Sequence, residues 1–391
     1  MLYALLALAA LGLLTSTGFA AMVLAAVPAY LRERRAALVQ MQARPGFTPP
    51  LTLLKPLHGA ETGLEADLET FFRQDYPLYE ILFCARSAED AGLETARRVA
   101  ARHPNIQAKF LSTGEPKYIN AKVASMELME AAASYEILVI SDSDVRVTPD
   151  YLRAVALPFA NPCVGAITCP YRGVAIEGGL WARLEAVGMS VEMTAGVLAA
   201  RMMEGMQFVL GPTMVFRRAT VRKMGGFKVT ADYCADDFVL GNETYKLGEK
   251  VVLSHHAIDH MVINSDFVDS MKHQIRWMKS TRFSRPAGHL GTALTFSVPY
   301  GILALATAAA LGHPFWGIAL FAWSIATRLA LSLAVGRAVA GDRSWFTSLI
   351  FYPIRDLMGF CFWVASYWGR NVLWRGRVFE LLPGGKMRAA K

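Results

Sequence analysis

Stretches without a charged residue occupy both ends of this 391-residue chain, and they restrict its architecture more than any other feature. Residues 2–29 carry no charge, and about 20 apolar residues suffice for a helix to cross a bilayer. Further apolar segments lie at residues 293–312, 315–335 and 345–368. A long polar stretch separates the two ends, so we expect a folded polar domain attached to membrane helices.

The N-terminal apolar stretch is predicted to be a retained transmembrane anchor. Small residues at 25–29 would also suit a cleaved signal peptide. A signal peptide, however, has its positive charge before the apolar run, whereas Arg32, Arg34 and Arg35 follow it here. Because Lys and Arg are enriched on cytoplasmic flanks, we expect the N-terminus outside and residue 32 onward in the cytoplasm.

The charge and cysteine content narrow the classes of partner. The net charge is +8 and the isoelectric point is about 9.2. No basic stripe stands apart from the apolar segments, so anionic lipid headgroups explain this charge better than nucleic acid does. The five cysteines are odd in number and lack CxxC spacing, which indicates a reducing compartment without disulfides or structural zinc.

The C-terminal apolar segments are not alike. The first two are typical of a hairpin that turns at His313 and Pro314. The third contains Arg355 and Asp356, and charges are costly in hydrocarbon. Two explanations stay open, an ion pair between these two residues and a role at the mouth of an active site. A re-entrant or interfacial path is favoured for residues 345–368, because full crossing would put the basic tail outside.

The polar middle alternates short apolar runs with amphipathic stretches, a pattern typical of an α/β sheet. Helices are predicted at residues 63–73, 93–101, 120–132 and 238–246, and strands at residues 51–54, 79–85, 107–111, 136–140, 164–170 and 207–217. Gly211 and Pro212 are expected to break the last of these strands.

One acidic pair, Asp142 and Asp144, directly follows the apolar run at residues 136–140. Ligands of open α/β sheets bind at the carboxyl ends of the strands. Ser143 is small and lets both carboxylates turn toward one divalent cation, either Mg²⁺ or Mn²⁺, and such a cation stabilises a departing diphosphate. A surface turn is the alternative, but the position after a buried strand favours a metal site.

A second acidic pair, Asp236 and Asp237, precedes a predicted helix. Such residues are ordinary helix caps, but one of them could also act as general base for an attacking hydroxyl. Lys122 lies with Lys117 and Asn120 where a loop enters a helix, a place suited to phosphate binding. A solvated helix face is the alternative for these residues.

Arg276 and Trp277 belong to a basic and aromatic segment at residues 271–282, just before the C-terminal apolar block. An amphipathic helix at the membrane interface explains this composition. A diphosphate contact by Arg276, with Trp277 beside the acceptor, is compatible with that position. For His255, His256 and His260 a structural role is favoured over metal binding.

Taken in order, these residues resemble the ceramide glucosyltransferase family, a branch of the inverting GT-A glycosyltransferases. The resemblance runs over nearly the whole chain and includes Asp90 after the second predicted strand. It implies a Rossmann-like GT-A domain that transfers one sugar from a UDP-sugar to a lipid hydroxyl with inversion. The GT-A domain is expected at residues 45–265, with the anchor at 1–31, an interfacial segment at 266–290 and membrane segments with a basic tail at 291–391.

The resemblance also implies individual roles. Asp90 would contact the nucleotide, Asp144 the metal, and Asp142 both. Asp237, with Asp236 beside it, would supply the catalytic base. Three further positions belong to the family's Q/R-x-x-R-W motif: Arg276 and Trp277 match it, while His273 stands where Gln or Arg is usual and Gln274 follows it.

Residues 279–291 are most similar to the bacterial hopanoid-associated branch of this family, which implies N-acetylglucosamine transfer to bacteriohopanetetrol at a bacterial inner membrane. A ceramide glucosyltransferase using UDP-glucose is the alternative. A processive polysaccharide synthase shares the acidic pairs but should need more spanning helices. A lipid-binding scaffold with an inactive site is the non-enzymatic alternative.

Overall fold

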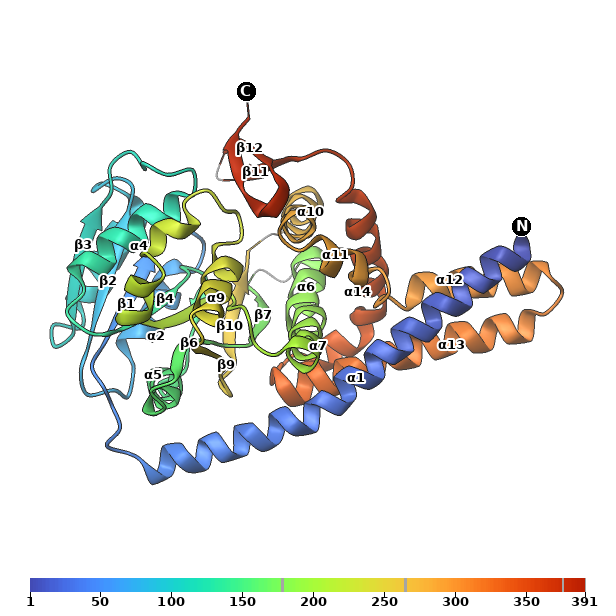
Figure 1. Ribbon diagram of the computed structural model, residues 1–391, viewed down its shortest axis with the longest axis horizontal. Helices are drawn as coiled ribbons and strands as arrows, with labels where there is room; N and C mark the ends of the chain where they lie inside the picture. Colours follow the sequence, from blue (N-terminus) through green and yellow to red (C-terminus); the bar gives the residue numbers. More distant parts are fainter. Residues whose placement is uncertain (177–178, 264–265, 375, 391) are drawn as a thin grey trace. The chain divides into compact units, whose positions relative to one another are not determined.

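A computed structural model describes residues 1–176, 179–263, 266–374 and 376–390 (Figure 1). The chain forms two compact units, each described here by itself. The sheet unit comprises Arg32–Tyr171 and Glu204–Met261, and the helical unit comprises Met1–Leu31, Arg172–Met203 and Val262–Lys391. These units differ from the predicted boundary at residues 45–265, because Arg172–Met203 packs with the C-terminal segments.

A seven-stranded mixed sheet with the strand order β3-β2-β1-β4-β8-β6-β9 is the core of the sheet unit. The β1, β2, β3 and β4 strands are parallel, β8 is antiparallel to both β4 and β6, and β9 is parallel to β6. All residues of β1, β2 and β4 are buried, as expected for strands covered on both faces. The strand bounds are Leu51–Pro56 for β1, Tyr79–Ala85 for β2, Gln107–Ser112 for β3, Ile137–Ser141 for β4, Val164–Thr168 for β6, Thr213–Arg217 for β8 and Lys250–Leu253 for β9.

Helices connect and cover these strands (Figure 1). Their bounds are Leu64–Phe72 for α2, Ala91–Ala101 for α3, Ala121–Ala132 for α4, Tyr151–Ala156 for α5, Arg218–Lys223 for α8 and Asp236–Lys246 for α9. The α/β class is confirmed. The predicted break at Gly211 and Pro212 is confirmed, but only the part after it is a strand of the sheet, because β8 begins at Thr213 and Leu210 forms only an isolated bridge with Thr213.

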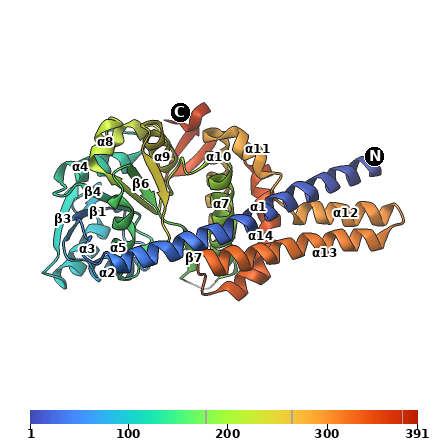
Figure 2. The same ribbon diagram turned by 60° about the horizontal axis from the view of Figure 1, so that its bottom comes forward.

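The helical unit contains the apolar ends of the chain. In the described residues, three helices are long and apolar enough to cross a membrane, namely Leu2–Ala43, Pro314–Val339 and Trp345–Ala365. The first is α1, the second joins α13 (Pro314–Leu331) to the π-helix η4 (Ser332–Val339), and the third is α14. A shorter helix, α12 (Val298–Ala310), forms a hairpin with α13, and both lie beside α1 (Figures 1 and 2).

The predicted hairpin of α12 and α13 is confirmed, but its turn lies at Leu311 and Gly312, slightly before the predicted position, and Pro314 is already the first residue of α13. Helix α12 approaches its neighbours closely. A Cβ at Gly301 would lie 2.3 Å from Oγ of Ser324 on α13, so a larger residue would force the helices apart. Small residues at helix contacts are typical of membrane bundles, where packing rather than apolar burial holds helices together.

The helical unit also contains shorter elements besides the apolar helices, and several of them pack against α14. They include α6 (Leu180–Val187), the π-helix η2 (Gly188–Met193) and α7 (Thr194–Glu204), none of which the sequence pattern predicted. Helix α10 (Phe267–Ser284) contains the predicted basic and aromatic segment, and α11 (Pro286–Thr292) follows it. A small sheet of β11 (Asn371–Trp374), β12 (Arg377–Leu381) and β13 (Met387–Ala389) ends the chain.

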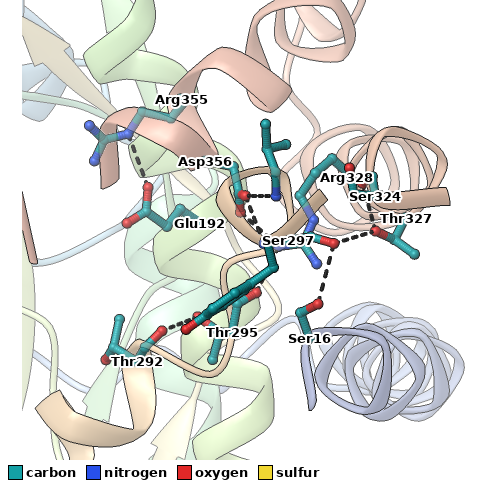
Figure 3. A network of polar contacts seen from close by, with 12 residues as sticks. Ser16, Glu192, Thr292, Thr295, Ser297, Ser324, Thr327, Arg328, Arg355 and Asp356 are labelled. Atoms are coloured by element: carbon teal, nitrogen blue, oxygen red, sulfur yellow. Dashed lines mark hydrogen bonds and ion pairs between the residues drawn. The ribbon is translucent and has the colours of Figure 1, made fainter. Parts of the chain in front are cut away.

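Arg355 and Asp356 do not pair with each other in α14, so the mutual ion pair is wrong. Asp356 pairs with Arg328 of α13 at 2.8 Å, and its other oxygen accepts hydrogen bonds from the N–H groups of Ser297 and Val298, both at 2.8 Å (Figure 3). These N–H groups belong to the first turn of α12, where a helix leaves donors without internal partners. Asp356 therefore caps one apolar helix, α12, and pairs with another, α13.

Arg355 points to different partners. Its Nε lies 3.0 Å from the Glu192 carboxylate of η2 (Figure 3), and its Nη2 donates to Oε1 of Gln274 on α10 at 2.7 Å. A Cβ on Gly188 would lie 2.3 Å from Nε of Arg355, so the glycine makes room for the guanidinium. Arg355 thus connects α14 to both η2 and α10.

Candidate active site

The first acidic pair lies in a short turn between β4, which ends at Ser141, and β5 (Val145–Arg146). Several hydrogen bonds hold this turn. Oγ of Ser143 donates to the Glu61 carboxylate at 2.7 Å, and the carbonyl of Asp144 accepts from N–H of Met261 at 2.8 Å. Strand β10 (Ile258–Val262) pairs with β5 beside it. The predicted position of the pair at the end of a buried strand is confirmed.

Lys122 connects the two acidic pairs. Its Nζ lies 2.7 Å from Oδ1 of Asp142 and 3.7 Å from Oδ2 of Asp236. The residue stands in the first turn of α4, whose cap Asn120 accepts from N–H of Lys122 at 3.1 Å and donates to the carbonyl of Tyr233, also at 3.1 Å. Asn120 thus links the start of α4 to the loop that precedes the second acidic pair.

The charges of this group act on one another. Burial lowers the pKa of Lys122, but the negative charges of Asp142 and Asp236 outweigh burial and leave this pKa above its ordinary value. Burial raises the pKa of Asp142, but the charge of Lys122 outweighs it and holds this pKa below the usual range. Both groups are therefore charged at neutral pH.

The second acidic pair opens α9, and Asp237 contacts the turn before β8. Its Oδ2 accepts a hydrogen bond from N–H of Gly211 at 2.9 Å, and its Oδ1 accepts one from N–H of Phe238 at 2.8 Å. A Cβ on Gly211 would lie 3.4 Å from Oδ2 of Asp237 and 3.8 Å from Oδ2 of Asp142. One carboxylate of each acidic pair, Asp237 and Asp142, therefore lies beside Gly211.

Asp237 has the electrostatic properties of a general base. Burial, and then the negative charge of Asp236 beside it, raise the pKa of Asp237 to about 6. A base with a pKa near the operating pH combines a large ionised fraction with a useful driving force for proton transfer. The cap geometry at Phe238 does not exclude this role, because a carboxylate oxygen has two lone pairs.

Two further residues, His260 and Tyr171, lie at this edge of the sheet. The sequence favoured a structural role for His260 and gave no role to Tyr171. Nε2 of His260, on β10, lies 3.7 Å from Oδ2 of Asp144, and its ring lies 5.5 Å from the ring of Tyr171. Burial, and then the charges of Asp237 and Asp144, raise the pKa of Tyr171 above its ordinary value. Tyr171 directly follows the strand predicted at residues 164–170. That position at a strand end is the feature of the sequence that could have indicated a place near the site.

The other histidines lie differently. Strand β10 begins at Ile258, so His256 does not share a strand face with His260. Its Nε2 lies 3.1 Å from Oγ1 of Thr148. Burial lowers the pKa of His255 to about 4.

Lys55 is a buried residue at this site that the sequence pattern missed. Its Nζ donates to the backbone carbonyl of Asp142 at 2.5 Å, and the side chain is fully buried. Burial lowers the pKa of Lys55 to about 7, against the attraction of Asp142 and Asp144. The predicted strand ended at residue 54, whereas β1 continues to Pro56.

Asp90 and Lys117 have partners away from the two acidic pairs. Asp90 caps α3 by accepting from N–H of Gly92 at 2.8 Å, and both its oxygens lie 3.1 Å from N–H of Gly59. It therefore holds the loop after β1 against α3, and its nucleotide contact stays a prediction. Lys117 pairs with Glu127 at 3.0 Å.

Arg276 and Trp277 lie on α10 in the helical unit, so their predicted roles at the donor site stay predictions. The helix is held in place by contacts of His273 and Gln274, within one turn before Arg276. Nδ1 of His273 lies 2.6 Å from the Glu185 carboxylate of α6, and its ring is 4.5 Å from the ring of Trp277. Gln274 accepts from Arg355.

The site fits a divalent cation in part. Oδ1 of Asp144 and Oδ2 of Asp236 are buried, and among the described residues neither oxygen has a hydrogen-bond partner. No three His, Cys, Asp or Glu side chains in this part of the chain are grouped closely enough to hold a metal by themselves. Two carboxylates nevertheless suit Mg²⁺, which keeps several waters and takes further oxygens from substrate phosphates.

Comparisons with known proteins identify the family of this chain. A sequence model of glycosyl transferase family 21 matches residues 13–387. Ceramide glucosyltransferase 1 of Caenorhabditis elegans is 25% identical over 352 residues, which cover 88% of this chain and 74% of that protein. Ceramide glucosyltransferase of Komagataella phaffii is 33% identical over 101 residues, 25% of this chain and 20% of that protein.

Solved structures with lower similarity include a Pyrobaculum calidifontis mannosyltransferase in complex with GDP-Man and Mn²⁺. It has a TM-score of 0.48 and 19% identity, and the match covers 87% of this chain and 99% of that one. S. aureus TarS 1–349 in complex with UDP-GlcNAc has a TM-score of 0.39 and 12% identity, with 88% and 99% covered. Because the family model spans nearly the whole chain, this protein belongs to glycosyl transferase family 21 and is a membrane glycosyltransferase with a GT-A-like α/β domain.

Proposed function

We propose that this glycosyltransferase transfers one sugar from a UDP-sugar to a hydroxyl group of a membrane lipid, with inversion at the sugar carbon. The observation that carries the proposal is that the two acidic pairs lie close together: Asp142 and Asp237 are both beside Gly211, and Lys122 lies near Asp142 and Asp236. Direct displacement at a sugar carbon needs one base for the acceptor and one stabilised leaving group. The two acidic pairs supply separate groups for these two tasks.

Asp237 is the proposed base. It accepts the proton of the acceptor hydroxyl while the hydroxyl oxygen forms a bond to the sugar carbon. The bond from that carbon to the phosphate oxygen breaks, and UDP leaves with the electron pair. Gly211 and Phe238 orient the carboxylate through their N–H groups, so the base is held in place before substrate arrives.

Lys122, Asp142 and Asp144 are proposed to bind the donor. Lys122 lies close enough to both acidic pairs to bring a positive charge to the diphosphate. A divalent cation held by Asp142 and Asp144 would neutralise charge that develops on the departing UDP. Asp90, Arg276 and Trp277 are proposed to contact the nucleotide, the diphosphate and the acceptor respectively.

Ceramide and glucose are the first choice of acceptor and sugar, because the relatives that match most of this chain are named ceramide glucosyltransferases. Transfer of N-acetylglucosamine to bacteriohopanetetrol is the second, supported by residues 279–291. Both acceptors present a hydroxyl at the membrane surface, so the same base and donor site serve either one.

The test is UDP release by the detergent-purified protein with Mg²⁺ or Mn²⁺. UDP-glucose and UDP-N-acetylglucosamine are each paired with ceramide and with bacteriohopanetetrol. We expect release that requires one sugar and one lipid and is lost in Asp237→Asn. Asp232→Asn, an exposed carboxylate in the preceding loop, is the matched control and should keep full activity.

Three results would contradict the proposal. If Asp237→Asn released UDP as fast as the unchanged protein, Asp237 would not be the catalytic base. A polymeric sugar product would indicate a processive synthase. Nucleotide binding without release, with any donor and lipid, would indicate a scaffold with an inactive site.

A further inference from the structure

A lysine is buried directly behind the acidic turn. Lys55 lies on the central strand β1 and its side chain is fully buried, as are Leu51 and Leu53 on the same face of the strand. Burying an ammonium group is costly unless it is paired and hydrogen-bonded. Another leucine would pack equally well at this position of the strand. Packing alone therefore does not explain a lysine here.

The contacts of Lys55 are unusual for a buried cation. Its Nζ donates to the backbone carbonyl of Asp142 at 2.5 Å and to Oγ of Ser141 at 3.4 Å, and it lies 3.8 Å from the centre of the Phe71 ring. These partners are a carbonyl, a hydroxyl and an aromatic face, all of them neutral. Lys55 therefore binds the backbone of the turn, while the carboxylate of Asp142 pairs with Lys122.

The carbonyl that Lys55 binds has a special position. It belongs to the peptide group between Asp142 and Ser143, which lies between the two residues that carry the acidic pair. The rotation of this peptide group sets the direction of one carboxylate relative to the other. The short hydrogen bond from Nζ of Lys55 to this carbonyl restrains that rotation.

The neighbouring positions of the turn are fixed as well. Ser143 bonds to Glu61 through its side chain, and the carbonyl of Asp144 accepts from Met261. Lys55 supplies the corresponding restraint at Asp142, from inside the sheet. Mutation of a group that orients a metal ligand commonly lowers the affinity for the metal, although the group itself does not contact the metal.

We propose that Lys55 is a positioning residue that fixes the peptide group between Asp142 and Ser143, so that both carboxylates are presented together to the cation and diphosphate of the donor. This inference rests on the proposed function, because it takes Asp142 and Asp144 as the donor-binding carboxylates. A purely structural lysine would instead affect folding and donor binding to the same degree.

The experiment measures binding of Mn²⁺ and UDP by calorimetry, together with the melting temperature, for Lys55→Met and the unchanged protein in detergent. Methionine matches the length of lysine and removes its charge and donor. We expect the affinity for Mn²⁺ with UDP to fall about 10- to 100-fold, the range typical for loss of a group that orients a metal ligand. The melting temperature should not fall, because removing a buried charge relieves its desolvation cost.

Leu53→Met is the matched control, since it lies on the same face of the same strand and is equally buried. It should leave Mn²⁺ and UDP affinity unchanged. Lys55→Arg retains a charged donor and should recover part of the lost affinity. If Lys55→Met does not fold, Lys55→Gln, which keeps an N–H donor without the charge, is measured in its place.

Donor kinetics give a second readout. We expect Lys55→Met to raise KM for the UDP-sugar while KM for the lipid stays the same. Mn²⁺ and UDP affinity within about two-fold of the unchanged protein would overturn the inference, as would an equal loss in Leu53→Met. An unchanged protein that binds no Mn²⁺ with UDP would overturn it too. Tight binding without sugar transfer in the unchanged protein would instead contradict the proposed function alone.

Discussion

The carboxyl of Asp237 shows how strongly the surroundings of one residue set its chemistry. It accepts two backbone N–H groups, which favour the ionised form, and yet its pKa is raised, because burial and Asp236 disfavour that form more. A base of this kind is ionised at neutral pH but protonated in mild acid.

We therefore expect the rate of sugar transfer to fall as the pH decreases through about 6, where Asp237 becomes protonated. The measurement is kcat/KM for the donor between pH 5 and 8. Asp232→Asn should show the same acidic limb as the unchanged protein. A profile that stays flat down to pH 5 would contradict the assignment of Asp237.

The same shift has a consequence for stability. The pKa of Asp237 in the folded protein lies above its ordinary value of 3.8, so the stabilising contribution of its protonated form is lost as the pH rises through about 6. Asp237→Asn should melt at or above the temperature of the unchanged protein at pH 8, and this advantage should shrink toward pH 5.

At the scale of single residues, the sequence predicted the acidic positions well and the basic ones less well. Asp142 and Asp144 follow an apolar run, and that pattern alone places them at the sheet edge. Lys55 interrupted the apolar pattern and ended the predicted strand early. Its partners, the Asp142 carbonyl and the Phe71 ring, come from distant parts of the chain, and no local pattern reveals them.

At the scale of elements, helix α14 explains why charged residues lie in an apolar segment. Asp356 caps α12 and pairs with Arg328 of α13, while Arg355 reaches η2 and α10. The sequence predicted the helices of the hairpin but not these pairings, because each partner is far away in the chain. The helices at residues 180–204 were missed altogether.

We expect Asp356→Asn to destabilise the protein by roughly 3–5 kcal/mol, since removing one partner of a buried ion pair leaves Arg328 as an unpaired buried charge. The measurement is thermal unfolding in detergent. Asp269→Asn, at an exposed position of α10, should leave the melting temperature unchanged. The double variant Arg328→Met, Asp356→Asn should lose less stability than the sum of its single variants, and full additivity would contradict a direct pair.

At the scale of the whole molecule, charge and hydropathy together predict how the chain is oriented in a membrane. Arg32, Arg34 and Arg35 follow the apolar part of α1, so the sheet unit is proposed to lie on the cytoplasmic side. The fold of that unit was predictable because strands and helices follow local patterns. The division into two units was not, because Arg172–Met203 joins the helical unit only through tertiary contacts.

Cys163 offers a direct test of the orientation, since it is exposed and belongs to the sheet unit. A maleimide that does not cross membranes should label Cys163 in inside-out vesicles from a bacterial host and leave it unlabelled in intact spheroplasts. Cys163→Ala provides the background from the other cysteines. Labelling of Cys163 in intact spheroplasts would place the sheet unit outside.

The cap on α12 also sets an order of events during synthesis. Asp356 lies 58 residues beyond Val298, whose N–H it accepts. At about 5–20 residues per second, the ribosome needs roughly 3 to 12 seconds to add the capping carboxylate after it has added Val298. During that interval the first turn of α12 depends on water or on other proteins for its hydrogen bonds. The first turn of α12 thus receives its cap only after Asp356, in α14, has been translated.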